Sequence, residues 1–153
     1  MKKVNLLASI ALVGLMMGPG WAYAHGNEVH ADAGKAANGG QVQVAGANHF
    51  ELVVVKDSKE IRDNPVLVYV TDGTGKKLAT TGATGTATLL AGKDKTVITL
   101  APDGDNRMMG TGKYASAAGL KAVISITLAG KPTGQARFTP LAAVMDEHTD
   151  HKH

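Results

Sequence analysis

Residues 49–55 read His-Phe-Glu-Leu-Val-Val-Val, and this run decides the fold class. Phe50, Leu52 and Val54 fall on one face of an extended chain, because successive side chains of a strand point to opposite sides. His49 and Glu51 share the other face with Val53 and Val55. A wholly apolar face opposite a face that carries polar side chains is typical of a strand that covers a hydrophobic core. We therefore predict a β-strand here.

The same alternation recurs further along the chain, where Ile98 and Leu100 share one face and Ile124 and Ile126 share another. Turn-forming Gly, Asp, Asn and Pro residues separate the β-rich runs. The predicted strands are residues 41–44, 49–55, 66–71, 86–90, 96–101, 121–128 and 136–139. About seven short strands with frequent turns predict an all-β domain over residues 41–140, built as an antiparallel β-sandwich.

Two short glycine-rich segments resemble each other: Asp72-Gly-Thr-Gly-Lys76 and Met109-Gly-Thr-Gly-Lys113. A phosphate-binding loop has Ser or Thr after its lysine, whereas these lysines precede Lys77 and Tyr114. We interpret both segments as hairpin turns.

Residues 1–24 have the pattern of a cleavable signal peptide, with Lys2 and Lys3 before an apolar run and Ala22-Tyr-Ala24 at the cleavage site. The apolar run is shorter than the roughly 20 residues that span a bilayer. The sequence thus predicts a periplasmic protein that starts near Ala24/His25 and does not span the membrane. A flexible lead-in at 25–40 and a flexible tail at 141–153 are expected to flank the domain.

Charge and motifs exclude several classes of function. The formal charge of +3 falls to +1 without Lys2 and Lys3, leaving 14 basic against 13 acidic side chains, and no basic stretch indicates nucleic-acid binding. The chain has no cysteine, which removes disulfides and thiolate ligands. It lacks a Gly-x-Ser-x-Gly elbow and a His-Glu-x-x-His motif, so we predict that it is not an enzyme.

The histidines are the chemically informative residues, because five of the six lie near the two ends of the expected mature chain, residues 25–153. They are His25, His30, His148, His151 and His153, and Asp150 lies among the last three. Imidazole and carboxylate groups suit Cu(II), Zn(II), Ni(II) and Co(II), and short His-rich tracts often bind metals. We predict a divalent metal ligand, Cu(II) or Zn(II) first; the alternative is a solvated tail that binds nothing.

Three further placements of a metal remain open. Cleavage after Ala24 gives His25 a free amine beside its ring, and cleavage after Ala22 makes it the third residue; both arrangements chelate Cu(II). His49 and Glu51, about 6.5–7 Å apart on one strand face, form either a metal site or an ordinary polar pair. Met108 and Met109 offer thioethers to Cu(I), but neighbours on a strand point to opposite faces, which favours core packing for one of them.

A series of short motifs resembles a known family. It comprises Gly39-Gly-Gln-Val42, Asn48-His-Phe-Glu-Leu-Val-Val54, Val68-Tyr-Val-Thr-Asp72, Thr81-Gly-Ala-Thr-Gly85 and Leu100-Ala-Pro-Asp-Gly-Asp-Asn106. The series is similar to small exported proteins of bacterial heavy-metal efflux and resistance systems, and to N-terminal extensions of periplasmic adaptor subunits of metal-exporting pumps. The resemblance implies an immunoglobulin-like sandwich and an efflux adaptor as partner. The family pattern has a histidine before the Gly-Gly pair, where this chain has Asn38.

These features lead to two hypotheses of different classes. The first is a periplasmic accessory protein that binds or buffers a transition metal and is linked to metal efflux. The second is a non-catalytic interaction module that docks on an adaptor or another envelope protein, with histidines that are incidental.

Overall fold

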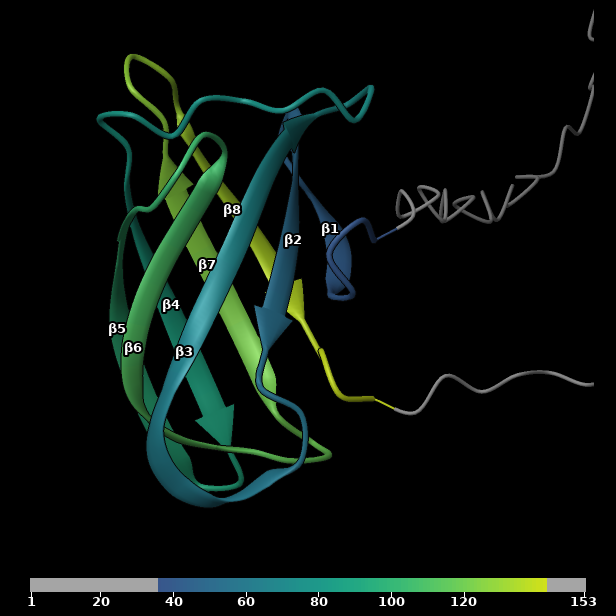
Figure 1. Ribbon diagram of the computed structural model, residues 1–153, viewed down its shortest axis with the longest axis vertical. Coiled ribbons are helices and arrows are strands. Elements are labelled where there is room, and N and C mark those ends of the chain that lie inside the picture. The colour runs from purple at the N-terminus through teal and green to yellow at the C-terminus, as the bar shows by residue number, and fades with distance from the viewer. Residues whose placement is uncertain (1–35, 143–153) are drawn as a thin grey trace, which may run out of the picture.

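The computed structural model describes residues 36–142, which form eight β-strands (Figure 1). In chain order they are β1 (Gln41–Ala45), β2 (Asn48–Val54), β3 (Ser58–Asp72), β4 (Thr84–Ala91), β5 (Asp94–Pro102), β6 (Arg107–Ser116), β7 (Lys121–Thr127) and β8 (Thr133–Phe138). Every pair of neighbouring strands is antiparallel. The predicted all-β antiparallel class is confirmed. The predicted signal peptide, most of the lead-in and all but two residues of the tail lie outside the described residues.

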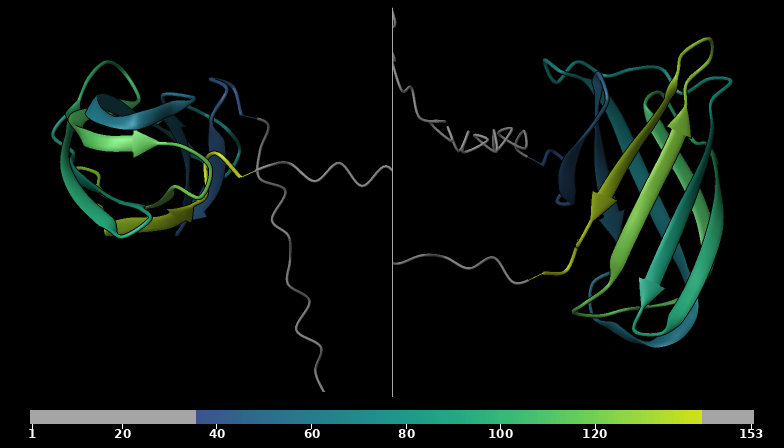
Figure 2. Two further views of the ribbon diagram at one scale, coloured as in Figure 1. Left: turned by 90° about the horizontal axis from the view of Figure 1, so that it is seen from below. Right: turned by 180° about the vertical axis from the view of Figure 1, so that it is seen from behind.

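The strands follow one continuous order, β1-β2-β3-β6-β5-β4-β7-β8. Seen along its axis in Figure 2, this sheet curls into a nearly closed ring. The arrangement is barrel-like, and a two-sheet sandwich of the immunoglobulin type is not confirmed. Closure brings β1 and β8, the two edges of the sheet, next to each other.

A seam between β1 and β8 closes the ring without a continuous ladder of backbone hydrogen bonds. The strands approach closely at Gly134, where a Cβ atom would lie 3.0 Å from Phe50 Cζ and 3.1 Å from the Ala45 carbonyl oxygen. Just beyond β8, the backbone N–H of Thr139 donates to the side-chain oxygen of Gln41 at 2.8 Å. The start of β1 is therefore tied to the residue that follows β8.

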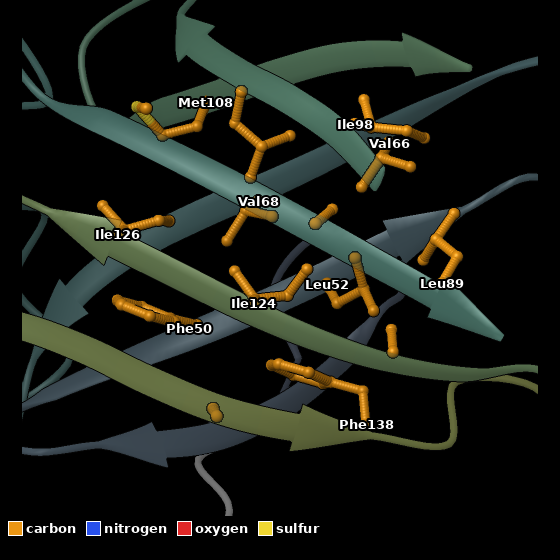
Figure 3. Close-up of a cluster of buried hydrophobic side chains, with 14 of the residues drawn as sticks. Phe50, Leu52, Val66, Val68, Leu89, Ile98, Met108, Ile124, Ile126 and Phe138 are labelled. Atoms are coloured by element: carbon orange, nitrogen blue, oxygen red, sulfur yellow. The ribbon is translucent and has the colours of Figure 1, made fainter. Parts of the chain in front are cut away.

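The interior of the ring is filled by the side chains that the alternation pattern assigned to it (Figure 3). Phe50 and Leu52 from β2 are completely buried, as is Ile124 from β7, and Ile98 from β5 is nearly so. The inward-facing positions predicted for these three strands are thus confirmed. Burial of apolar area, at about 25 cal/mol per Å², is the main stabilising contribution in a chain without disulfides.

The turn predicted at 109–113 is wrong, because these residues lie inside β6. A Cβ atom on Gly110 would come within 2.4 Å of the Thr99 carbonyl oxygen, and one on Gly112 within 2.5 Å of Ile98 Cγ1. The two glycines allow β5 to cross closely over β6 where the sheet bends. Glycine here marks close backbone approach rather than a turn.

Strand β3 is also longer than the predicted run 66–71, because it begins at Ser58. Its first half is mostly polar and exposed, so it carries no apolar alternation. Pairing with β6 and the buried side chain of Asn64 hold it in place: Asn64 Nδ2 donates to the Tyr114 carbonyl oxygen at 2.8 Å and to Ser58 Oγ at 3.2 Å.

Candidate functional site

His49 and Glu51 line one pocket of about 310 Å³ on the outer surface of β2 and β3. They share the outward face of β2, as predicted, and their partners across β3 are Thr71 and Tyr69. The remaining lining comes from the segment before β1, from β1 itself, from the 72–77 turn region and from the end of the loop that leads into β6: Ala37, Asn38, Val42, Gly75, Lys77 and Asn106. The pocket thus offers one imidazole, one carboxylate, one ammonium and hydroxyl groups.

The Glu51 carboxylate is already occupied by hydrogen bonds from the chain that precedes β1. Its Oε1 accepts from the backbone N–H of Asn38 at 2.7 Å and from that of Gly40 at 3.0 Å. Its Oε2 accepts from Asn38 Nδ2 at 2.9 Å. Glu51 is only 6% exposed, so this carboxylate pins residues 38–40 onto the barrel.

His49 is half-buried. Within residues 36–142, no three His, Asp or Glu side chains come together in a group that could hold a metal ion. Both Glu51 oxygens already accept hydrogen bonds from Asn38 or Gly40. The geometry therefore favours the ordinary polar pair over a complete metal site at His49 and Glu51.

Charged groups at the same end of the barrel are held by local contacts. Hydrogen bonds from the Thr74 hydroxyl at 2.6 Å and from the Lys76 and Thr74 backbone N–H groups lower the pKa of the Asp72 carboxyl. They close the turn over residues 72–76, which confirms the turn predicted there. Hydrogen bonds to Tyr69 and Asp103 raise the pKa of the Arg107 guanidinium, which forms an ion pair with Asp103 at 2.6 Å.

The two methionines have separate roles. Met108 is completely buried in the core, whereas Met109 is 39% exposed on the outer face of β6. The prediction that one of the pair serves core packing is confirmed. The two thioethers point to opposite sides of the strand and do not form a joint Cu(I) site.

The other predicted ligands lie outside the described residues: His25, His30, His148, Asp150, His151 and His153. The structure does show where the chain segments that carry them join the barrel. Residues 38–40 are pinned to Glu51, and Thr139 is bonded to Gln41. Both ends of the described chain therefore lie on the same side of the barrel, beside the β1–β8 seam (Figure 1).

Sequence reasoning missed the residues that bring the ends together, namely Asn38, Gly40, Gln41 and Thr139. They lie at or just outside strand ends, where no periodic pattern marks them. The one available signal was the Gly39-Gly-Gln-Val42 motif, which resembles a family pattern but does not indicate these contacts.

Comparisons with protein-family models, with curated proteins and with solved structures found no match to this chain. In the part of the chain that the structure describes, no helix is long and apolar enough to cross a membrane.

Proposed function

We propose that this chain is exported to the periplasm and binds a divalent transition metal through histidines from both segments that flank the barrel. In this proposal it buffers metal for an efflux or resistance system. The observation that carries it is the junction at the seam, where the Thr139 N–H donates to Gln41 and the preceding residues are pinned to Glu51. The barrel is then a scaffold that holds two histidine-bearing segments at one place.

Chain length supports ligation of a single ion by both segments. His30 precedes Asn38 by eight residues, and His148 follows Ala142 by six. At about 3.3–3.6 Å per extended residue, these stretches reach roughly 26–29 Å and 20–22 Å from the barrel. Histidines from the two segments are therefore within reach of one another near the seam.

The chemistry of the donors selects the metal class. Neutral imidazoles with a carboxylate from Asp150 suit Cu(II) and Zn(II), and an amine at His25 adds a chelating nitrogen for Cu(II) after cleavage. Because the imidazoles must be deprotonated to bind, affinity is expected to fall below about pH 6.5.

Calorimetric titration of the chain that starts at His25 with Cu(II) and with Zn(II) tests this proposal. The variants are His25→Ala/His30→Ala, the triple alanine variant of His148, His151 and His153, and a matched His49→Ala control. We expect saturable binding with one ion per chain, weakened at least tenfold by either end variant and unchanged by the control.

Two results would count against the proposal. Absence of saturable binding in the unmodified chain would remove the metal function and favour an interaction module instead. Loss of binding on His49→Ala alone would move the site to the pocket on β2.

A further inference from the structure

A second groove lies on the outer face of β4, β7 and β8 and extends to Lys95 on β5. It has a volume of about 450 Å³, and its charged lining consists of Lys95, Lys121 and Arg137. No Asp or Glu side chain lines it. Among residues 36–142 the ion pairs are Arg62–Glu60 and Arg107–Asp103, so these three cations have no ionic partner there.

Strand register arranges the lining in two rows. Leu90 on β4 pairs with Lys95 on β5 and with Lys121 on β7, so an apolar side chain lies between two lysines. In the next row Val123 on β7 pairs with Thr88 and with Arg137. Leu90 is 39% exposed. The groove therefore combines exposed apolar surface with unpaired positive charge.

We propose that residues 146–150 of the same chain, Asp-Glu-His-Thr-Asp, bind across this groove. The segment carries three carboxylates, Asp146, Glu147 and Asp150, against the three cations of the groove. The proposal is independent of metal, because it uses the carboxylates and the groove cations rather than imidazole ligation.

The described part of the chain ends close to this groove, so residues 146–150 are within reach of it. Thr139 itself lines the groove, and the Ala142 N–H donates to the Thr139 carbonyl oxygen at 3.0 Å in a turn that follows β8. The seven residues from Thr139 to Asp146 reach up to about 23–25 Å. The groove spans four strands, about 14 Å at 4.8 Å per strand, and five extended residues cover roughly 13 Å.

Covalent attachment makes weak contacts sufficient. Exposed ion pairs are individually weak and are screened by salt. A short tether, however, presents the segment at an effective concentration in the millimolar range. Docking of this kind should therefore be populated at low ionic strength and disappear at high ionic strength.

Paramagnetic relaxation enhancement tests the proposal in the chain that starts at His25, with EDTA present to exclude metal. Because the chain has no cysteine, Thr149→Cys gives a single site for a nitroxide label. At low salt we expect the amide signals of Leu90, Lys121 and Val123 to be broadened at least twofold more than those of Ile61 and Met109 on β3 and β6. We expect the difference to vanish in about 0.5 M salt.

Two sets of variants locate the contacts. Lys121→Glu/Arg137→Glu should abolish the selective broadening, whereas Lys59→Glu/Lys113→Glu, with the same change in net charge on the other side of the barrel, should keep it. Asp146→Asn/Glu147→Gln/Asp150→Asn changes no barrel residue and should also abolish it. Three results would overturn intramolecular docking. The labelled chain could show no selective broadening, or the broadening could survive both the groove variant and the segment variant. It could also disappear when the labelled chain is diluted with unlabelled protein. The last result would assign the groove to a second copy. None of these results depends on the metal titration, so the two proposals fail separately.

Discussion

Replacing Glu51 with Gln should detach the chain that precedes β1 from the barrel. In the native protein Oε1 accepts two backbone N–H groups and Oε2 accepts Asn38 Nδ2. Glutamine keeps one oxygen for the two backbone donors, but its amide nitrogen can only donate, so the native bond from Asn38 Nδ2 is lost unless the Asn38 side chain turns its Oδ1 toward it. The backbone hydrogen bonds also lose their charge assistance, which about doubles the strength of such bonds.

The expected loss follows from these contacts. Hydrogen bonds to charged groups contribute about 1.5–3 kcal/mol each and neutral ones about 0.5–1.5 kcal/mol. Weakening two bonds and losing the third gives several kcal/mol as an upper limit. Asn38 is exposed, so part of this is recovered by solvent. We expect a decrease of about 2 kcal/mol, or roughly 10 °C in Tm for a domain of this size.

Urea denaturation followed by far-UV circular dichroism measures the global effect, and amide hydrogen exchange at Gly40 measures the local one. The matched control is Glu60→Gln, since Glu60 forms an exposed ion pair with Arg62 and its side chain is 82% exposed. The control should change stability by less than about 0.5 kcal/mol. Equal urea midpoints for the two variants, with unchanged protection of the Gly40 amide, would refute the assigned role of Glu51.

Three further changes test the fold and the site. Gly112→Ala places a Cβ 2.5 Å from a side-chain carbon of β5 and should cost about 1–3 kcal/mol in urea denaturation; unchanged stability would contradict the close strand crossing. Burial raises the pKa of Tyr114 to about 12 from its ordinary value of 10.0, so its contribution to stability is complete below pH 10 and is lost as the pH rises to about 12. Tyr114→Phe should remove this part of the alkaline loss, and a stability difference between the two proteins that stays constant from pH 9 to 12 would contradict it. Asn38→His puts a third metal ligand beside Glu51 and His49, and should add one equivalent of bound Zn(II) that His49→Ala removes again. A titration curve like that of the unmodified chain would contradict this, and would show that the hydrogen-bonded Glu51 carboxylate is not available as a ligand.

Alternation predicted the inward-facing side chains because a half-buried strand exposes only one face to solvent. It succeeded at Phe50 and Leu52 in β2 and at Ile124 in β7, which are completely buried. Closure into a barrel-like ring was not predictable in the same way, because it depends on how the sheet bends. The two glycines of β6 that allow this bend have the same sequence signature as a turn.

The candidate site was predicted only in part. The shared face of His49 and Glu51 follows from the two-residue period of a β-strand. The hydrogen bonds by which the Glu51 carboxylate holds residues 38–40 do not. They depend on Asn38 and Gly40, which precede β1 and have no periodic signal. The approach of the two chain ends likewise rests on a contact between Gln41 and Thr139, 98 residues apart.

Double electron–electron resonance between nitroxides at Ala33→Cys and Thr149→Cys tests most directly whether the two flanking segments share one metal ion. The absence of native cysteine makes this pair specific. We expect a broad distance distribution in EDTA that contracts to a single short distance with one equivalent of Zn(II) and is restored by chelation. A distribution that stays the same with and without saturating Zn(II) would contradict a metal site built from both ends of the chain.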